Sequence, residues 1–306
     1  MCAVGVQHRE GSGRGHQGRG SGGRGPDHGQ QEREEGLTRV PSVDLRGLPI
    51  AITGASSGIG RATALACARA GMPVAIAARR EDRLAEVVAE IEREGGRAIA
   101  VRGDVDDPGD CRRLVERTID AFGLIYAAFA NAGYGLEKPI HETTDAEARA
   151  IFETNFWGTL NTLHAALPPM LQAGRGHLLV CSSCLAKMGT PLHGFYSATK
   201  AAQDHVARAM RIELAGRGVY VSSVHPIGTR TEFTSRKSEM NPERPPTRPP
   251  LMQDASVVAS ATVRCLRRPR GEVWTSLPAR LLFALGCAMP GLADRAMARW
   301  MRRTER

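Results

Sequence analysis

The sequence predicts an α/β protein built on one doubly wound parallel sheet of about seven strands. Three observations lead to this fold class. Short apolar runs alternate with helical stretches from residue 48 onward, and a glycine-rich turn joins the first strand to the first helix. The third is the run Leu124–Ala130, which is apolar throughout. Such a strand is typical of parallel sheets that helices cover on both faces.

The elements follow in a regular order along the chain. Seven apolar runs predict strands at Leu48–Thr53, Val74–Ala78, Ala98–Val101, Leu124–Ala130, His177–Cys181, Val219–Val224 and Glu272–Thr275. Helical patterns fall at Ile59–Ala70, Asp82–Glu94, Pro108–Phe122, Asp145–Leu171, Tyr196–Gly216 and Ser256–Arg267. Gly95 and Gly96 end the second helix, and Pro108 begins the third. Right-handed crossovers then give a Rossmann-type sheet that binds ligands at the carboxyl ends of its strands.

The segments outside this pattern divide the chain into three parts. Residues 1–45 are rich in Gly and Arg, and we expect a disordered extension or a start codon assigned too early. Residues 46–276 are expected to form the Rossmann-type domain, in which the proline-rich stretch 228–254 predicts a long lid loop. Residues 277–306 predict a basic amphipathic helical tail.

The net charge of +9 is unevenly distributed. Residues 47–229 hold 19 basic and 19 acidic side chains, whereas residues 230–306 hold 15 and 7. A neutral folded body argues against a nucleic-acid partner, and residues 1–45 lack the interleaved Phe or Tyr of RNA-binding Arg/Gly segments. The sequence shows neither an apolar run long enough to span a membrane nor a signal peptide, so we expect a cytoplasmic protein.

The seven cysteines are expected to be free thiols. Cys181 and Cys184 have C-x-x-C spacing, but no second pair or histidine lies near them in the sequence. We therefore expect two buried thiols and no metal site.

The turn Thr53–Gly60 has the features of a pyrophosphate-binding loop. Glycines allow a tight turn and a close approach of the backbone, and the N-terminus of the next helix attracts phosphate. Arg79 and Arg80 follow the second strand, where a protein that prefers NAD usually has Asp or Glu. Guanidinium groups suit the 2′-phosphate of NADP(H), so NAD(H) is the less favoured cofactor. The alternative is that both arginines are ordinary surface residues.

Tyr196 and Lys200 are spaced i and i+4, on one face of a predicted helix. Only four lysines occur in the chain, which makes this pairing more informative. Ser183 comes 13 residues before Tyr196 and follows a buried strand, at the edge of the sheet where ligands bind.

These motifs together resemble the short-chain dehydrogenase/reductase family. The matching residues are TGASSGIG at 53–60, GDV at 103–105, NAG at 131–133, Asn155, Ser183 and YSATK at 196–200. Their order and spacing fit the family, and the resemblance covers roughly residues 46–275.

The resemblance implies a role for each matching residue. Tyr196 would be the catalytic acid or base, and the Lys200 ammonium would favour its phenolate and hold the nicotinamide ribose. Ser183 would polarise the substrate carbonyl, and Asn155 would hold a water that relays protons to Lys200. Besides Tyr196 and Lys200, the cofactor would contact Gly54, Ser56, Ser57, Gly58, Ile59, Gly60, Arg79, Arg80, Asp104, Val105, Asn131, Ala132, Gly133, Pro226 and Thr231.

Three of these assignments have alternatives. Asp104 could cap a helix, Asn155 could be a helix-surface amide, and Ser182 competes with Ser183. The family's Pro-Gly after the sixth strand is Pro226-Ile227 here, so the carboxamide contact at this turn is less certain.

The resemblance implies an NADP(H)-dependent oxidoreductase that interconverts a ketone or aldehyde and an alcohol, as a homodimer or homotetramer. A cofactor-binding scaffold without catalysis is the competing hypothesis. Apolar residues after Ser183 favour a lipophilic substrate, unless they only pack their own loop; they are Leu185, Met188, Leu192 and Phe195.

The basic tail has three interpretations. It could pack on the domain with a solvated basic face, or contact an anionic membrane as a peripheral helix pair. It could also attract an anionic substrate carrier.

Overall fold

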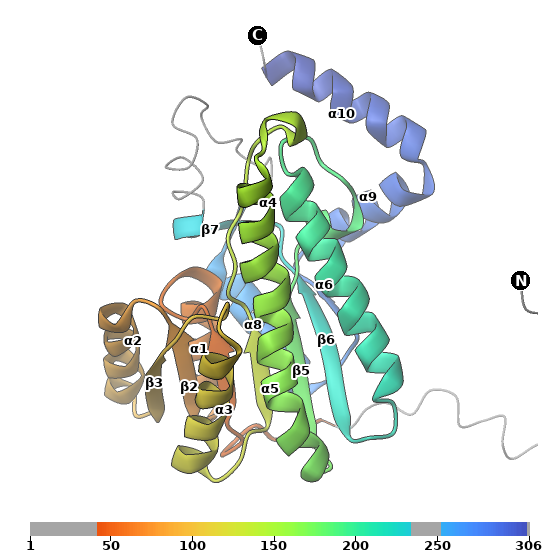
Figure 1. Ribbon diagram of the computed structural model, residues 1–306. Coiled ribbons are helices and arrows are strands. Elements are labelled where there is room, and N and C mark those ends of the chain that lie inside the picture. Colours follow the sequence, from red (N-terminus) through yellow and green to blue (C-terminus); the bar gives the residue numbers. More distant parts are fainter. Residues whose placement is uncertain (1–41, 234–251, 305–306) are drawn as a thin grey trace, which may run out of the picture. The chain divides into compact units, whose positions relative to one another are not determined.

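A seven-stranded parallel sheet forms the centre of the fold, which confirms the predicted class. The structure is a computed structural model that describes residues 42–233 and 252–304. The strand order is β3-β2-β1-β4-β5-β6-β9, so β2 and β3 are added on one side of β1 and the later strands on the other, beginning with β4 (Figure 1). The strands are β1 Ile50–Thr53, β2 Val74–Ala78, β3 Ala98–Arg102, β4 Ala127–Ala130, β5 Gly176–Cys181, β6 Val219–His225 and β9 Glu272–Trp274.

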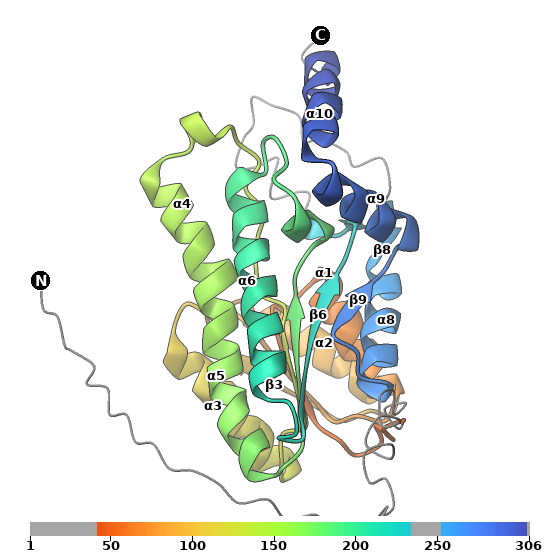
Figure 2. The same ribbon diagram turned by 90° about the vertical axis from the view of Figure 1, so that its right-hand side faces the viewer.

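Helices cover both faces of this sheet. Figure 2 shows α3, α5 and α6 on one side and α8 on the other. Two apolar cores result: one joins α1, α2 and α8 to the sheet, and the other joins α3, α5 and α6 to it. The helices are α1 Gly58–Arg69, α2 Glu81–Arg93, α3 Pro108–Phe122, α4 Asp145–Phe152, α5 Gly158–Gln172, α6 Gly194–Glu213, α8 Ala255–Arg267, α9 Leu277–Ala288 and α10 Pro290–Thr304.

Local sequence explains why these helices form where they do. In α2, Leu84, Val87 and Ile91 are buried at helical spacing, while the rest of the helix is largely polar. In α3, Asp107 accepts a hydrogen bond from the Gly109 amide at 2.7 Å and Pro108 occupies the first turn. Gly123 ends α3 in a left-handed conformation, with φ +84°.

The structure differs from the sequence prediction in three places. The single helix expected over Asp145–Leu171 is broken by a π-helical turn, Glu153–Trp157, which separates α4 from α5. The ends of the expected lid loop are short strands, β7 Gly228–Arg230 and β8 Met252–Asp254, which pair in parallel; residues 234–251 lie outside the described part.

The third difference concerns the start of the folded domain. It begins before residue 46, because Leu45 is buried and the Val43 amide donates to the Arg267 carbonyl at 2.8 Å. Residues 1–41 of the predicted extension lie outside the described residues.

His177 on β5 makes folding sensitive to acid. Its ring is fully buried, its Nε2 lies 2.7 Å from Ser222 Oγ, and burial lowers its pKa to about 3. The unfolded chain therefore binds a proton, at a pKa near 6.5, that the folded chain does not bind until about pH 3. Stability from this group is fully present above pH 6.5 and falls as the pH drops towards 3.

We expect His177→Gln to reduce the loss of unfolding free energy between pH 8 and pH 5 by about 2 kcal/mol. Urea denaturation at both pH values measures this difference, and His164→Gln, on the exposed face of α5, is the matched control. An unchanged pH dependence in His177→Gln would show that His177 is protonated at little cost in the folded protein.

Candidate active site

The glycine turn after β1 has a left-handed backbone conformation at two positions, which favours glycine there. Gly54 and Gly58 have φ values of +65° and +56°. A Cβ on Gly54 would lie 2.7 Å from Ala132 Cα, and one on Gly60 would lie 2.4 Å from the Gly54 carbonyl oxygen. Ser57 precedes α1 without forming a side-chain capping bond. The turn therefore presents amide groups and a helix N-terminus as a cradle for phosphate.

Asn131 joins this turn to the end of β4. Its Nδ2 donates to the carbonyl oxygens of Thr53 and Gly54 at 3.0 and 3.2 Å. The backbone amides of Asn131 and Ala132 donate to Thr53 Oγ1 at 3.1 and 3.3 Å. Asn131 thus lies beside the glycine turn, the loop that we expect to hold the cofactor.

The two arginines after β2 lie beside other residues of the predicted cofactor set. Arg80 Nη2 donates to Ser56 Oγ at 3.1 Å and pairs with Glu232 Oε2 at 2.9 Å. Arg79 Nη1 lies 3.6 Å from Asp104 Oδ2. Arg80 is the less exposed of the two side chains, 34% against 62%, and it lies beside the glycine turn.

Asp104 and Val105 are two further residues of the predicted cofactor set. Asp104 does not cap α3, so that alternative is wrong: Asp107 is the cap, and Asp104 Oδ1 accepts from the Asp106 amide at 3.3 Å. Val105 packs against α5 so closely that a Cβ on Gly158 would lie 2.5 Å from Val105 Cγ2.

Thr231 reaches the glycine turn from the start of the expected lid. A Cβ on Gly58 would lie 3.1 Å from Thr231 Cβ. Glu232 follows it, and its pairing with Arg80 was not predicted from sequence, because the two residues are 152 positions apart. The Arg80 guanidinium holds the pKa of Glu232 below its usual range. Glu232 therefore places a carboxylate at the group that we expect to bind the 2′-phosphate.

Ser183, Tyr196 and Lys200 come together at the carboxyl ends of β5 and β6. Tyr196 is buried, and the Ser183 side chain lies close enough to lower the pKa of its phenol. Ser183 Oγ also accepts from the Leu185 amide at 3.1 Å. Ser182 points elsewhere, because its Oγ donates to the Lys200 carbonyl oxygen at 3.2 Å. This geometry favours Ser183 over the competing Ser182 as the residue that would contact a substrate.

Burial determines the protonation of the two titratable groups. It raises the pKa of Tyr196 above its ordinary value, more than the hydrogen bond with Ser183 lowers it. It lowers the pKa of Lys200 to about 8. Lys200 Nζ donates to the Cys181 carbonyl oxygen at 2.8 Å and lies 5.8 Å from the centre of the Tyr196 ring. The expectation that Lys200 lowers the pKa of Tyr196 is thus not met in this arrangement, because desolvation of the phenolate dominates.

Asn155 is buried in the π-helical turn, so the surface-amide alternative is wrong. Its Oδ1 accepts from the Tyr134 amide at 2.9 Å, and its Nδ2 donates to the Tyr134 carbonyl oxygen at 2.9 Å and to Thr199 Oγ1 at 3.1 Å. Gly133 lies between Asn155 and Lys200: a Cβ there would be 2.8 Å from Asn155 Oδ1 and 3.7 Å from Lys200 Nζ.

The loop after Ser183 is fixed from several sides. The Cys184 amide donates to the Pro226 carbonyl oxygen at 2.9 Å. Tyr134, Leu185, Phe195 and Phe233 pack around Tyr196 and give it an apolar surrounding. Met188 instead lies against Gly286 of α9, where a Cβ would be 3.0 Å from its sulfur. Cys181 and Cys184 are buried free thiols, and burial raises both pKa values.

A buried charge cluster supports Ser183 from behind, and the sequence analysis missed it. His225 Nδ1 lies 3.1 Å from the Ser183 carbonyl oxygen, and its Nε2 lies 3.3 Å from Asp204 Oδ1. Lys187 Nζ pairs with Asp204 Oδ2 at 2.5 Å and Glu272 Oε1 at 2.9 Å. The carboxylates could ligate a cation with His225, but Lys187 already neutralises them. The scarcity of lysine could have directed attention to Lys187, as it did to Lys200.

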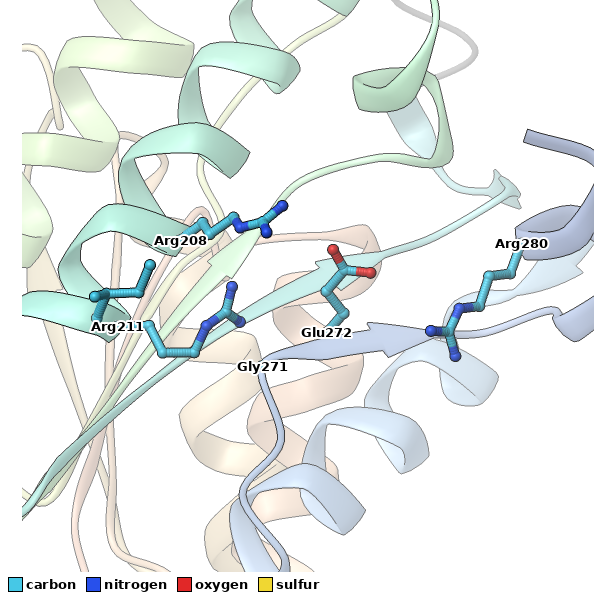
Figure 3. Close-up of a pocket in the computed structure, with 6 residues that line it drawn as sticks. Arg208, Arg211, Gly271, Glu272 and Arg280 are labelled. Carbon is cyan, nitrogen blue, oxygen red and sulfur yellow. The ribbon is translucent and has the colours of Figure 1, made fainter. Parts of the chain in front are cut away.

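A separate pocket of about 550 Å³ lies between α6, β9 and α9, away from the predicted site residues (Figure 3). Arg208, Arg211 and Arg280 line it, together with Glu272. It is basic and open rather than apolar, which does not suit the binding of a lipophilic carbonyl compound.

Fold and site together define a nucleotide-binding α/β protein with a serine, a tyrosine and a lysine at the ligand-binding edge of its sheet. The family model for short chain dehydrogenase matches residues 49–242. The chain therefore belongs to the short-chain dehydrogenase/reductase family of oxidoreductases.

Two curated relatives illustrate the range of similarity. The 11-beta-hydroxysteroid dehydrogenase 1A of Arabidopsis thaliana is 41% identical over 204 residues, which cover 66% of this chain and 58% of the plant protein. The chain thus matches little more than half the length of this relative. The uncharacterized oxidoreductase YxnA of Bacillus subtilis is 29% identical over 275 residues, which cover 89% of this chain and 77% of the other.

Solved structures of the family share the fold. A short chain dehydrogenase/reductase from Burkholderia phymatum in complex with NAD aligns with a TM-score of 0.74 and 26% identity, over 82% of this chain and 96% of the other. The alcohol dehydrogenase of Thermococcus sibiricus, complexed with 5-hydroxy-NADP, aligns with a TM-score of 0.65 and 29% identity, over 74% and 95%. Relatives thus include one that holds NAD and one that holds a form of NADP.

Proposed function

We propose that this protein is an NADP(H)-dependent oxidoreductase that interconverts a ketone or aldehyde and an alcohol. The observation that carries the proposal is the grouping of buried Ser183, Tyr196 and Lys200 at the edge of the sheet that also holds the glycine turn. A scaffold without catalysis has no chemical need for this arrangement. A panel of carbonyl compounds and alcohols, assayed with NADPH and NADP⁺, tests it; no turnover with any substrate would favour the scaffold.

The residues fit a nicotinamide dinucleotide. The glycine turn leaves space that a Cβ would fill, and Asn131 fixes that turn. Lys200 Nζ lies 5.8 Å from the centre of the Tyr196 ring. The pyrophosphate would be held by Gly54, Ser57, Ile59 and the start of α1. The adenine would lie against Asp104 and Val105, and the nicotinamide would lie near Pro226 and Thr231. Bound NADPH would supply a hydride to the carbonyl carbon.

The side chains would handle the proton at the substrate oxygen. Ser183 donates a hydrogen bond to the carbonyl oxygen and polarises it. Tyr196, whose raised pKa keeps the phenol protonated, donates its proton to that oxygen as the alcohol forms. Lys200 and a water held near Asn155 would return a proton to Tyr196. In the direction of oxidation, the same groups would act in reverse.

The cofactor preference rests on Arg80. Its guanidinium lies beside Ser56 and the glycine turn, and the residue that ends β2 is Ala78 rather than an acid that would repel a 2′-phosphate. Glu232 would have to leave Arg80 when that phosphate binds. A relative holds NAD, so the preference of this chain for NADP(H) over NAD(H) has to be measured with both cofactors.

We expect Arg80→Gln to weaken NADPH binding about tenfold or more, since a charge-assisted hydrogen bond contributes about 1.5–3 kcal/mol. NADH binding should change less than twofold, because NADH lacks the 2′-phosphate. Fluorescence titration of both cofactors measures this, with Arg83→Gln on α2 as the matched control. Equal weakening of both cofactors would place Arg80 outside the 2′-phosphate site.

The proposal has four further parts: a lipophilic substrate, a cytoplasmic location, a homodimer or homotetramer, and peripheral contact with a membrane. Leu185, Phe195 and Phe233 support the first of these, because they give Tyr196 an apolar surrounding in which a hydrophobic carbonyl compound would be desolvated.

A further inference from the structure

The helix α9 packs with its small residues inward and its leucines outward. Ala279 is its buried residue, and Gly286 and Cys287 contact the loop after Ser183; Cys287 Sγ lies 3.0 Å from the Lys187 carbonyl oxygen. The leucines lie on the other side of the helix. Leu277, Leu281, Leu282 and Leu285 are 63%, 63%, 65% and 57% exposed. A helix that simply closed the domain would bury these side chains, so that interpretation of the tail does not fit.

The helix α10 continues the pattern. Met289, at the bend before α10, and Leu292 and Trp300 within it are exposed and spaced at helical intervals, so they form a second apolar stripe. Arg295, Arg299 and Arg302 are also exposed, and helical spacing places them along one border of that stripe. Helical spacing likewise places Arg280 beside the α9 leucines. Its side chain lines the basic pocket together with Arg208 and Arg211 (Figure 3).

The lengths of the helices favour a position on a membrane rather than across it. No single helix in the described ranges is long and apolar enough to span a bilayer; the pair Leu277–Ala288 and Pro290–Arg302 qualifies only when taken together, and it is bent by 113°. At 1.5 Å per residue, each helix is shorter than a hydrocarbon core of about 30 Å. An apolar stripe bordered by arginines is the pattern of helices that lie in the headgroup region.

We propose that α9 and α10 dock on an anionic lipid bilayer, with the leucines entering the acyl boundary and the arginines contacting headgroup phosphates. A second copy of this chain is a poorer occupant, because a two-fold contact over this face would bring like-charged arginines together. A free anionic carrier would neutralise the arginines but leave four leucines in water.

This docking would bring the bilayer close to the substrate loop. The contacts of α9 with Lys187 and Met188 lie in the segment that follows Ser183. A lipophilic substrate dissolved in the bilayer would then enter beside Tyr196. This last step rests on the proposed function, whereas the docking itself does not.

Co-sedimentation of the full chain with phosphatidylcholine vesicles, with and without the anionic lipid phosphatidylglycerol, tests the proposal. We expect binding to the anionic vesicles that weakens as salt increases. Leu281→Glu/Leu285→Glu should weaken it at least tenfold, and Arg295→Gln/Arg299→Gln several-fold. The matched controls, Ile140→Glu/Trp157→Glu and Arg112→Gln/Arg117→Gln, alter exposed residues outside α9 and α10 and should bind like the wild type.

Thermal melting of each variant confirms folding, and light scattering records its oligomeric state. Equal binding by the leucine variant and its control would overturn the proposal. So would a wild type that binds no vesicle but dissociates into smaller species when the leucines are changed, because a second copy would then cover this face. Vesicle binding does not require turnover, so a failure of the proposed activity would leave this result unaffected.

Discussion

Tyr196→Phe is expected to lower kcat by about 10³-fold while the dissociation constant of NADPH changes less than twofold. The substitution removes one hydroxyl group, that of a buried tyrosine whose pKa the Ser183 side chain influences. General acid–base catalysis by a positioned group contributes about 10² to 10⁴-fold. Steady-state assays with the best substrate of the panel, alongside fluorescence titration of NADPH, measure both quantities.

Tyr220→Phe is the matched control, because it removes a phenol hydroxyl from the opposite end of β6. It should leave kcat within twofold of the wild type. Activity retained in Tyr196→Phe would remove Tyr196 from the acid–base role. A parallel loss of NADPH binding would instead assign the residue to holding the cofactor or the fold.

The fold was predictable because its determinants are local. The apolar strands, the alternation of strands and helices and the glycine turn all lie within short windows of sequence. Element bounds therefore agree closely, as in Val74–Ala78 and Pro108–Phe122. Asn131 and Thr231 lie beside the glycine turn, and Ser183 lies beside Tyr196, because the family motifs fall at the carboxyl ends of the strands.

Contacts between distant segments were not predictable in the same way. The π-helical turn at Asn155 depends on hydrogen bonds to the backbone of Tyr134, whereas the local pattern indicated one continuous helix. Glu232 meets Arg80 only because the chain returns over the glycine turn. The exposed face of α9 was ambiguous for a related reason: an amphipathic pattern does not say which face packs inward.

His225 is the clearest case of information that only the fold supplies. It ends β6, and three other elements meet around it: the loop after β5 with Ser183 and Lys187, α6 with Asp204, and β9 with Glu272 and Trp274. The Ser183 carbonyl oxygen can only accept, so Nδ1 carries a hydrogen, and Nε2 faces a carboxylate. These contacts tie the position of Ser183 to α6, the helix that carries Tyr196 and Lys200.

The value of kcat/KM for reduction is expected to fall as the pH rises through about 8, because burial lowers the pKa of Lys200 to about 8 in the free enzyme. Below this pH the ammonium can hold the cofactor ribose, and above it the neutral amine holds it more weakly. Other buried groups titrate elsewhere: burial raises the pKa of Tyr196 above its ordinary value and that of Cys184 to about 11. A fall near pH 8 would therefore report Lys200.

Lys200→Met should lower kcat/KM by about 10²-fold at pH 7, consistent with the loss of a positioned charged donor worth about 1.5–3 kcal/mol together with its part in returning a proton to Tyr196. The fall near pH 8 should disappear with it. Lys138→Met, which removes a lysine paired with Glu147 outside the site, should keep the wild-type pH profile. Profiles of kcat/KM from pH 6 to pH 10 measure all three proteins. Should the fall near pH 8 persist in Lys200→Met, another group controls it, and the lysine then acts through its position alone. Separate values of kcat and KM at pH 7 distinguish the two roles further. A purely positional role of Lys200 would raise KM for the cofactor without a matching change in kcat.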